Sequence, residues 1–365
     1  VFGAPRIYET IRSQIWLKID ESYRLNQAFY RYFMKVGETA AGYRMSGKRM
    51  PPLLAFKAWL GQTLVFQPLI NQVGFLRLRR AYTGGAALGP DLFTFYQAIG
   101  INLKQIYGQT EITGIAYMHS DGDVKSDTVG IPLPKTECKI SEEGEILSRS
   151  PSVCRGYYNL PDKADELLTE GWLHSGDAGY IDENGHLVVI DRLADVMHNR
   201  EGEMFSPQFL ENKLKFSPYI KEAVIFGDKM DFVAALINID PIIVGKWAED
   251  RGISFTTFMD LSLKPQVADL IGKQIEAFNR SVEKPHFRIR RWAMLYKLLD
   301  VDDGELTKTG KIRRKFVREK YTDLYEALYD QTVSEKKVEA QFQYQDGQTT
   351  KVETLLPFYT MEEVS

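Results

Sequence analysis

The first segment whose residues could do chemistry is Tyr82 to Leu88, which reads Tyr-Thr-Gly-Gly-Ala-Ala-Leu. Its small residues Gly84, Gly85 and Ala86 let the backbone come close to a flat ring or a phosphate, because no large side chain stands in the way. Two glycines after a strand are also common in ordinary turns. The segment therefore indicates one wall of a nucleotide site only in combination with others.

The second segment, Tyr107 to Glu111, places an aromatic ring, a hydroxyl and a carboxylate close together. Tyr107 could stack on a base, Thr110 could donate a hydrogen bond to a phosphate, and Glu111 could hold a hard cation such as Mg²⁺. Gly108 and Gln109 lie between these residues, and we include both in the predicted nucleotide site.

Two extended-looking runs precede these segments, Leu76 to Tyr82 and Ile101 to Tyr107. Between them, Asp91 to Ile99 has the pattern of a short helix that Gly100 ends, so the whole predicts a strand-helix-strand unit with a parallel sheet. In open α/β sheets, ligands bind beyond the carboxyl ends of the strands. We therefore expect both segments to lie at that edge.

Four further motifs follow in order along the chain: Trp172 to Asp177, Gly179 to Asp182, Asp191 to Asp195, and Gly304 to Arg314. Together with the two loops they resemble the adenylate-forming superfamily of acyl-CoA synthetases and luciferases, and its long-chain fatty acyl-CoA ligase branch best. The resemblance covers nearly the whole chain from Pro5 to about Leu328.

The resemblance implies an α/β fold, namely the C-terminal part of a large multi-layer α/β-β domain (residues 1–191) and a small mobile α/β lid domain (192–330). Residues 331–365 have the pattern of a β-hairpin, to which we assign no function. Because Asn184-Gly185 stands between two apolar runs, a second hairpin is predicted there. We expect it to place Asp177 and Arg192 near opposite ends of one β ribbon.

Roles for individual residues also come from the resemblance. Asp177 would accept hydrogen bonds from both ribose hydroxyls, with Arg192 assisting at the same sugar. Thr110 would bond the α-phosphate and Glu111 would hold Mg²⁺, while the ring of Tyr107 stacks on adenine. Lys311 would bridge the fatty carboxylate and the charge that develops as pyrophosphate leaves.

The implied reaction is ATP-dependent formation of a fatty acyl-adenylate, followed by attack of the coenzyme A thiol and release of AMP. Lys311 belongs to the second domain and Asp177 to the first, so we expect the small domain to rotate about Asp191 to Asp195 between the two steps. Ala194 replaces the Asp or Lys usual in this hinge. Two alternatives are open: a ligase that transfers the acyl group to a carrier protein, and a non-catalytic nucleotide- or acyl-binding module.

No phosphate loop rich in Ser, Thr and Gly is recognisable before Tyr82, although the family carries one upstream. We interpret the sequence as a C-terminal fragment and expect these residues alone to form acyl-CoA at no useful rate. Acyl chain length and oligomeric state are left open.

The composition, 365 residues with 44% hydrophobic side chains, predicts a folded protein of two or more domains. A net charge of −3 argues against general nucleic-acid binding, and two cysteines without metal-ligand spacing fit a reducing compartment. We see no apolar run long enough to cross a bilayer and no signal peptide. A cytoplasmic location is expected, with peripheral contact at the inner membrane face left open.

The N-terminal region has isoleucines every four residues from Ile7 to Ile19, and this period predicts one long amphipathic helix from Pro5 to Gly37. A second apolar helix is predicted around Leu54 to Leu60, and a further helix from Pro161 to Leu168. In the second domain, Ser206-Pro207 has the pattern of a helix start. The resemblance places the N-terminal region beside an acyl tunnel.

Overall fold

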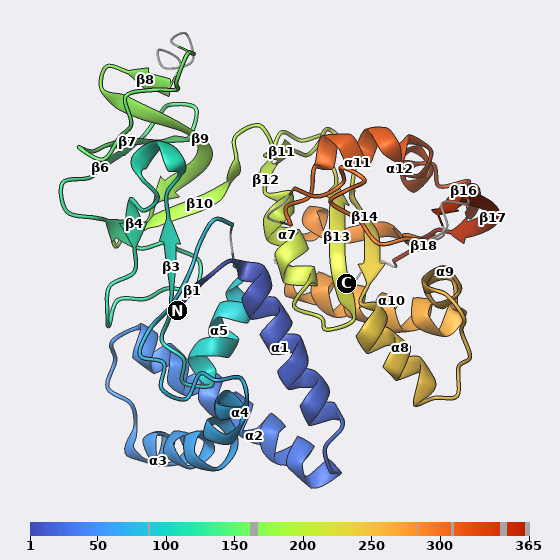
Figure 1. The fold of residues 1–365 in the computed structure, drawn as a ribbon, viewed down its shortest axis with the longest axis horizontal. Helices are drawn as coiled ribbons and strands as arrows, with labels where there is room; N and C mark the ends of the chain where they lie inside the picture. Colours follow the sequence, from blue (N-terminus) through green and yellow to red (C-terminus); the bar gives the residue numbers. More distant parts are fainter. Residues whose placement is uncertain (87, 161–166, 283, 308–309, 344–348, 362–365) are drawn as a thin grey trace. The chain divides into compact units, whose positions relative to one another are not determined.

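The computed structural model describes residues 1–86, 88–160, 167–282, 284–307, 310–343 and 349–361. The chain divides into two compact units, Val1–Val196 and Met197–Ser365, and each is described by itself (Figure 1). The helix predicted from Pro161 falls mostly outside the described residues, and Leu168 lies in a short strand.

The strands that carry the two predicted loops belong to one sheet of unit 1, with the order β1–β2–β3–β4–β5. Strands β2 and β3 run parallel and helix α5 connects them, which confirms the strand-helix-strand prediction. Strand β2 is shorter than predicted because it begins only after the charged Arg79 and Arg80. The bounds are β1 Phe2–Gly3, β2 Ala81–Thr83, α5 Pro90–Ala98, β3 Leu103–Tyr107, β4 Tyr117–Met118 and β5 Ile131–Pro132.

The N-terminal helical region is two helices, α1 (Pro5–Asp20) and α2 (Arg24–Met45), so the prediction of one helix ending at Gly37 is wrong. The side-chain amide of Gln27 donates to the main-chain oxygens of Asp20 (2.8 Å) and Ser22 (3.1 Å). These bonds satisfy carbonyl groups that the end of a helix leaves without a partner. Local hydrogen bonding therefore stabilises the break, which the apolar period alone does not reveal.

Two glycines let the helices of unit 1 pack closely. At Gly37, inside α2, a Cβ atom would lie 2.7 Å from the main-chain oxygen of Ala98, the last residue of α5. At Gly61 a Cβ atom would lie 2.6 Å from the ring of Phe33. Any larger residue at either position would force the backbones apart.

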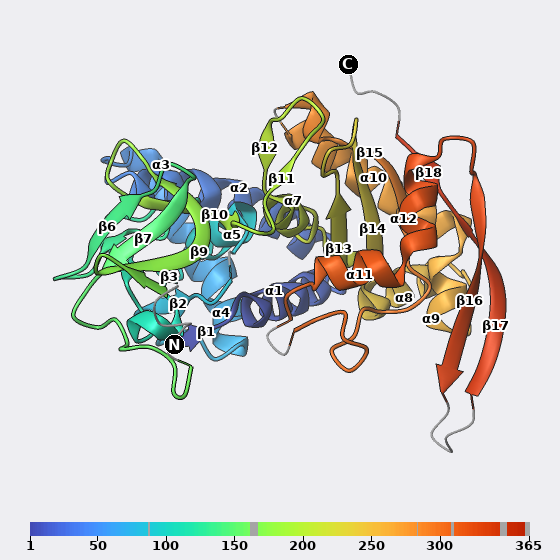
Figure 2. The same ribbon diagram turned by 90° about the horizontal axis from the view of Figure 1, so that it is seen from above.

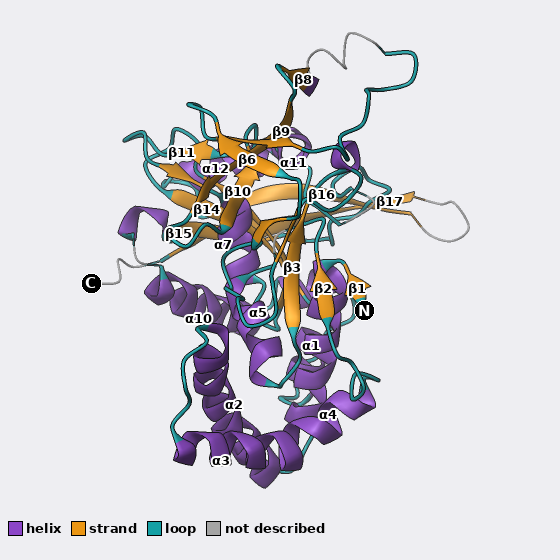
Figure 3. Cartoon of the chain, turned by 90° about the vertical axis from the view of Figure 1, so that its left-hand side faces the viewer, coloured by secondary structure: helices purple, strands orange, loops and turns teal. Residues whose placement is uncertain are grey.

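After Pro51 the chain continues through α3 (Pro52–Gly61), a π-helical turn η1 (Gln62–Phe66) and α4 (Gln67–Gln72). Figure 3 shows α2, α3 and α4 grouped away from strands β2 and β3. By length and composition alone, Pro52–Gln72 could cross a membrane, and only 17% of the apolar window is buried. The expectation that the chain has no apolar run of this length is therefore wrong.

A second sheet of unit 1 has the order β10–β9–β7–β6, and β8 pairs with β9. Strands β9 and β10 form the predicted hairpin, and Gly185 adopts the positive φ of 81° that its turn requires. The bounds are β6 Glu137–Ile140, β7 Glu145–Arg149, β8 Leu168–Thr169, β9 Trp172–Ile181 and β10 Leu187–Arg192. A single turn of 3₁₀ helix, η2 (Thr110–Ile112), follows β3.

Unit 2 is built on a sheet with the order β13–β14–β15–β18, and helices cover both of its faces. Alternate residues of β13 divide between two buried clusters: Ile225 packs with α7, α8 and α10, and Val224 packs with α11 and α12. The strands are β11 Met197–His198, β12 Met204–Phe205, β13 Ile220–Phe226, β14 Val233–Ile239, β15 Ile289–Met294 and β18 Tyr359–Thr360. The helices are α7 Pro207–Leu214, α8 Pro241–Glu249, α9 Phe258–Ser262, α10 Pro265–Ser281, η3 Pro285–Phe287, α11 Arg314–Lys320 and α12 Thr322–Tyr329.

Helix α7 begins where the sequence predicts. Ser206 is its N-cap, and the Ser206 hydroxyl accepts a hydrogen bond from the main-chain N–H of Phe209 (3.0 Å). The β11–β12 hairpin lies directly before this helix.

The C-terminal tail forms the predicted hairpin, β16 (Glu335–Gln343) with β17 (Thr349–Pro357), along an edge of unit 2 (Figure 2). Its expected turn at Asp346-Gly347 lies outside the described residues. Beyond the hairpin, β18 extends the main sheet by pairing with β15, and the ring of Tyr359 stacks on Trp292 with centroids 4.4 Å apart. The tail is thus part of the core of unit 2.

We predict that Leu356→Ala lowers the free energy of unfolding by about 2–5 kcal/mol, because the fully buried Leu356 side chain would leave a cavity. Its neighbour Leu355 is 52% exposed, so Leu355→Ala is a matched control that should change stability by less than about 0.5 kcal/mol. Urea unfolding measures both values. Equal effects of the two variants would show that the tail does not belong to the core.

Candidate nucleotide site and lysine loop

The two predicted nucleotide loops lie together at the carboxyl ends of β2 and β3, as expected. At Gly84 a Cβ atom would come 2.5 Å from Cγ1 of Ile106 in β3, and at Gly108 it would come 2.4 Å from the main-chain oxygen of Gly114. Gly85 has a φ of 83° and open space around its Cα. Glycine is therefore required at all three positions, for close approach at Gly84 and Gly108 and for a positive φ at Gly85.

Asp177 is the meeting point of three segments. The hydroxyl of Tyr107 donates to Oδ2 of Asp177 (2.5 Å), and Nε of Arg192 lies 3.1 Å from Oδ1. Asp177 and Arg192 are direct cross-strand partners in β9 and β10, so the expectation that they lie near opposite ends of the ribbon is wrong. The antiparallel register places them side by side, after a register shift between Val189 and Asp191.

The Asp177 carboxylate also affects the ionisation of Tyr107. Burial first, and then the charge of Asp177, raise the pKa of Tyr107 far above its ordinary value, so Tyr107 stays a hydrogen-bond donor. The main-chain N–H of Asp177 donates to the Ser175 hydroxyl (3.0 Å). A carboxylate has about four acceptor positions, so bonds from Tyr107 and Arg192 are compatible with acceptance from a vicinal diol.

The ring of Tyr107 is half-buried and packs against Tyr117, with centroids 5.6 Å apart. Close by in the sequence, the Thr83 hydroxyl at the end of β2 is fully buried and has no hydrogen-bond partner among the described residues. An orphaned polar group of this kind suits a ligand-binding edge. Ala86, the last residue of the predicted glycine-rich segment, is half-buried.

Thr110 and Glu111 lie in the turn η2, directly after Gln109. Oε1 of Glu111 accepts a hydrogen bond from the hydroxyl of Tyr157 (2.5 Å), and this bond raises the pKa of Tyr157. Thr110 is exposed. One half-buried carboxylate suits Mg²⁺, which proteins commonly hold through one or two carboxylates together with the phosphates of a substrate.

A chain of hydrogen bonds that the sequence did not reveal holds the main chain of β3. The main-chain N–H of Gln105 donates to Nδ1 of His119 (3.0 Å), so the proton of His119 is on Nε2, which bonds Oγ1 of Thr128 (2.9 Å). The Thr128 hydroxyl then donates to Nδ1 of His186, and Nε2 of His186 donates to Asp123 (both 2.9 Å). These residues are far apart in the sequence, and only the fold brings them together.

We predict that this histidine chain makes unit 1 less stable in mild acid. Burial, and then the neighbouring His186, lower the pKa of His119 from 6.5 to about 3. As pH falls, the unfolded chain therefore takes up the proton before the folded chain does. The stabilisation is complete above pH 6.5 and is lost between pH 6.5 and 3, amounting to about 2 kcal/mol at pH 5.

Urea unfolding at pH 7.5 and pH 5.0 measures this loss. In His119→Gln the difference between the two pH values should shrink by about 2 kcal/mol, whereas in the control His198→Gln, an exposed histidine, it should not change. The same pH dependence in His119→Gln and in the parent protein would refute the assignment.

The predicted lysine loop, Gly304 to Arg314, has an ordered base in unit 2. Leu306 and Ile312 pair as an antiparallel bridge, the main-chain N–H of Thr307 donates to the oxygen of Lys311 (2.8 Å), and the N–H of Lys311 donates to Oγ1 of Thr307 (3.0 Å). Residues 308–309 lie outside the described residues. The main chain of Lys311 is thus hydrogen-bonded to Thr307 on the other side of the turn.

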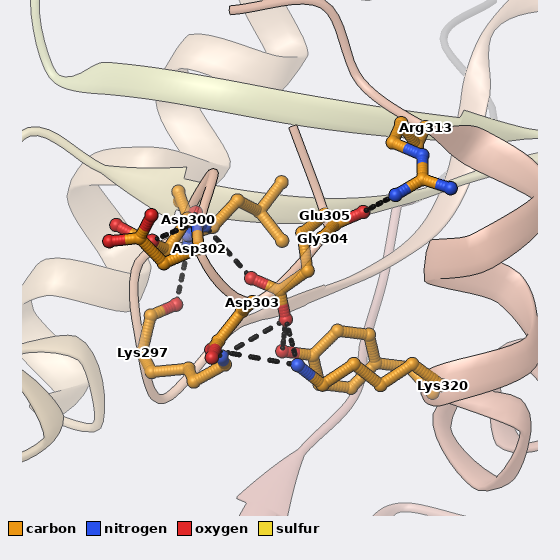
Figure 4. Close-up of polar contacts among 11 residues, drawn as sticks. Lys297, Asp300, Asp302, Asp303, Gly304, Glu305, Arg313 and Lys320 are labelled. Carbon is orange, nitrogen blue, oxygen red and sulfur yellow. Dashed lines mark hydrogen bonds and ion pairs between the residues drawn. The ribbon is translucent and has the colours of Figure 1, made fainter. Parts of the chain in front are cut away.

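Glu305 anchors this loop, a role that the sequence did not indicate. Its side chain is fully buried, pairs with Lys297 (3.0 Å) and Lys320 (2.9 Å), and accepts hydrogen bonds from Tyr321 (2.7 Å) and the N–H of Asp300 (2.9 Å), as Figure 4 shows. Burial is the largest single effect and raises the pKa of Glu305, but these donors together outweigh it and leave the pKa below its ordinary value. The charged carboxylate ties the loop to α11.

We predict that Glu305→Gln destabilises unit 2 by about 2–4 kcal/mol, because it removes the charge that Lys297 and Lys320 share. Hydrogen exchange at the amides of residues 306–312 should also become faster, since the loop loses its anchor. Asp302 is exposed just before this loop, so Asp302→Asn is the control and should leave both measurements unchanged. Unchanged exchange in Glu305→Gln would refute the anchoring role.

The sequence places these features in a known family. Residues 1–158 match the family described as AMP-binding enzyme, and residues 194–333 match the AMP-binding enzyme C-terminal domain. The chain belongs to the AMP-binding enzymes. This confirms the resemblance to the adenylate-forming superfamily.

Curated relatives extend the comparison. The chain is 31% identical over 333 residues to the long-chain-fatty-acid–CoA ligase FadD15 of Mycobacterium tuberculosis, and the match covers 90% of this chain and 54% of the relative. It is 27% identical over 377 residues to the long-chain-fatty-acid–CoA ligase heimdall of Drosophila melanogaster, again covering 90% and 54%. The chain therefore spans about half the length of the curated relatives it matches.

Solved structures support the predicted α/β fold. The adenylation domain of a carboxylate reductase from Mycobacterium chelonae is similar with a TM-score of 0.64 and 18% identity, covering 90% of this chain and 46% of that chain. The A domain of the carboxylic acid reductase from Segniliparus rugosus, solved with AMP and a co-purified carboxylic acid, has a TM-score of 0.59 and 19% identity, covering 91% and 47%. Both show the fold of an adenylation domain.

Proposed function

We propose that this AMP-binding enzyme activates a long-chain fatty acid with ATP and then forms its coenzyme A thioester. A carboxylate oxygen of the acid attacks the α-phosphorus of ATP, and pyrophosphate leaves. The thiol sulfur of coenzyme A then attacks the acyl carbon, AMP leaves with the bonding electrons, and the thiol proton passes to solvent. The long-chain substrate class is supported by the names of the curated relatives.

One observation carries the nucleotide part of this proposal. The Asp177 carboxylate is held between Tyr107 and Arg192, beside the loops that end β2 and β3. An oriented carboxylate can accept from both hydroxyls of a ribose, and the Arg192 guanidinium beside it is a charged partner for the same group. In the proposal Thr110 donates to the α-phosphate, and a Mg²⁺ ion held at Glu111 offsets phosphate charge.

Lys311 supplies the positive charge for the first step. Its ammonium group is compact and its stem is flexible, so it can approach the carboxylate and the α-phosphate and later withdraw. Lys311 belongs to unit 2 and Asp177 to unit 1. We propose that the two units adopt different arrangements for adenylate formation and for thioester formation.

Two variants, each made in the complete protein that the gene encodes, test this function. Lys311→Ala should reduce palmitate-dependent pyrophosphate release by at least about 100-fold, because a charge aimed at the reacting phosphate is lost. It should leave thioester formation from supplied palmitoyl-adenylate and coenzyme A largely intact. Asp177→Asn should instead impair both half-reactions, because both bind the AMP moiety.

Glu183 lies exposed on the same hairpin as Asp177, so Glu183→Gln is the matched control and should keep both activities. Equal losses in both half-reactions for a folded Lys311→Ala variant would show that Lys311 does not withdraw. Absence of palmitate-dependent pyrophosphate release in the parent enzyme would refute fatty acid activation. Transfer to a carrier protein but not to coenzyme A would identify the alternative acceptor.

A further inference from the structure

A group of three potential metal ligands lies in unit 2, and none of the three belongs to the candidate nucleotide site. Glu201, Glu203 and His286 each offer one ligand atom, and these atoms all lie within 4.8 Å of one another. Glu201 and Glu203 belong to the turn between β11 and β12, and His286 lies in the 3₁₀ turn η3. The fold thus joins residues that are more than eighty positions apart.

The turn that carries the two glutamates is held rigidly. The side chain of Asn199 accepts from the N–H of Glu203 (2.8 Å), and the N–H of Asn199 donates to the main-chain oxygen of Glu203 (3.0 Å). Gly202 closes the turn with a φ of 84°. The backbone of Glu203 is therefore fixed before any ligand binds.

Aromatic packing holds His286 against this turn. Its neighbour Phe287 is buried, and the Phe287 ring lies 5.0 Å from the ring of Phe205 in β12. The His286 ring packs edge-on against Phe287 at 4.3 Å. Because Phe205 follows Glu203 by two residues, this contact brings the imidazole to the glutamates.

A metal ion would take the place of the proton that Glu203 and His286 share. Oε2 of Glu203 and Nε2 of His286 are both buried and form an ion pair with each other, and neither atom has a hydrogen bond to another described residue. The ammonium group of Lys284 lies 3.3 Å from Oε1 of Glu203 and occupies only that side of the carboxylate. A metal-bound imidazole is neutral, so two carboxylates facing one ammonium then leave a net negative charge that favours a cation.

We propose that Glu201, Glu203 and His286 bind a divalent transition-metal ion of the zinc class. One imidazole nitrogen with two carboxylate oxygens suits Zn²⁺ better than Mg²⁺ or Ca²⁺, which prefer oxygen ligands alone. Around an ion whose ligands lie about 2.0–2.2 Å away, ligand atoms are farther apart than the paired Oε2 of Glu203 and Nε2 of His286, so this pair must separate as the ion enters. Glu201 is exposed and can move inward, and water completes the coordination.

A bound ion would cross-link the β11–β12 turn to η3. The metal site does not depend on the proposed function. Its test therefore uses metal uptake, which is independent of any acyl or nucleotide chemistry.

Calorimetric titration of the full chain with Zn²⁺ at pH 7.5 tests the site, with Co²⁺ absorption as a report of the ligand set. The two cysteines are changed to serine in all samples, so that thiols in unit 1 do not bind the metal. We expect one equivalent to bind. His286→Asn and Glu203→Gln should each weaken binding by at least about tenfold, because each removes a ligand.

Lys284→Gln should act in the opposite direction and tighten binding, because it removes the ammonium group that competes for Glu203. The exposed His198 flanks the same turn, and the control His198→Gln should leave the affinity unchanged. Excess Mg²⁺ should not displace Zn²⁺. Uptake that is insensitive to His286→Asn and Glu203→Gln in folded protein, or no uptake at all, would overturn the proposal.

Discussion

The carboxylate of Asp177 is the constraint on which the candidate site depends. It is nearly buried, and a buried carboxylate is stable only when donors replace the water it has lost. Tyr107 and Arg192 supply such donors from β3 and β10, while Asp177 itself lies in β9. Satisfying one charge therefore joins the sheet that carries the nucleotide loops to the hairpin that carries the predicted ribose pair.

Unit 2 repeats this principle at Glu305. There a fully buried carboxylate gathers two lysines, a tyrosine and a main-chain N–H, and the loop that presents Lys311 begins at this point. In both units a buried charge with several partners fixes the base of a functional loop.

Supporting interactions lie outside the motifs that indicate the chemistry. One example is the chain of hydrogen bonds that begins at the main chain of β3. It runs from Gln105 through His119, Thr128 and His186 to Asp123. In unit 2, the tail strand β18 and the stacked pair Trp292 and Tyr359 complete the sheet. None of these residues has a role in the motifs, yet the sheets that carry the motifs depend on them.

Local patterns in the sequence were enough to predict the elements that short-range chemistry controls. The strand-helix-strand unit from β2 to β3, the turn at Asn184-Gly185 and the N-cap at Ser206 follow from residue type and spacing, because their stabilising contacts lie within a few residues. The glycine-rich loop and Tyr107 to Glu111 lie at the carboxyl ends of β2 and β3, as the sequence predicted.

Contacts between distant residues could not be predicted in this way. The cross-strand pair of Asp177 and Arg192 depends on strand register, and the break after Asp20 depends on Gln27 reaching back to two carbonyl groups. The group of Glu201, Glu203 and His286 depends on the packing of Phe205 on Phe287. The sequence specified which side chains were available and which loops carried them. Tertiary packing decided which side chains meet, because burial, register and charge compensation are properties of segments that the chain brings together only on folding.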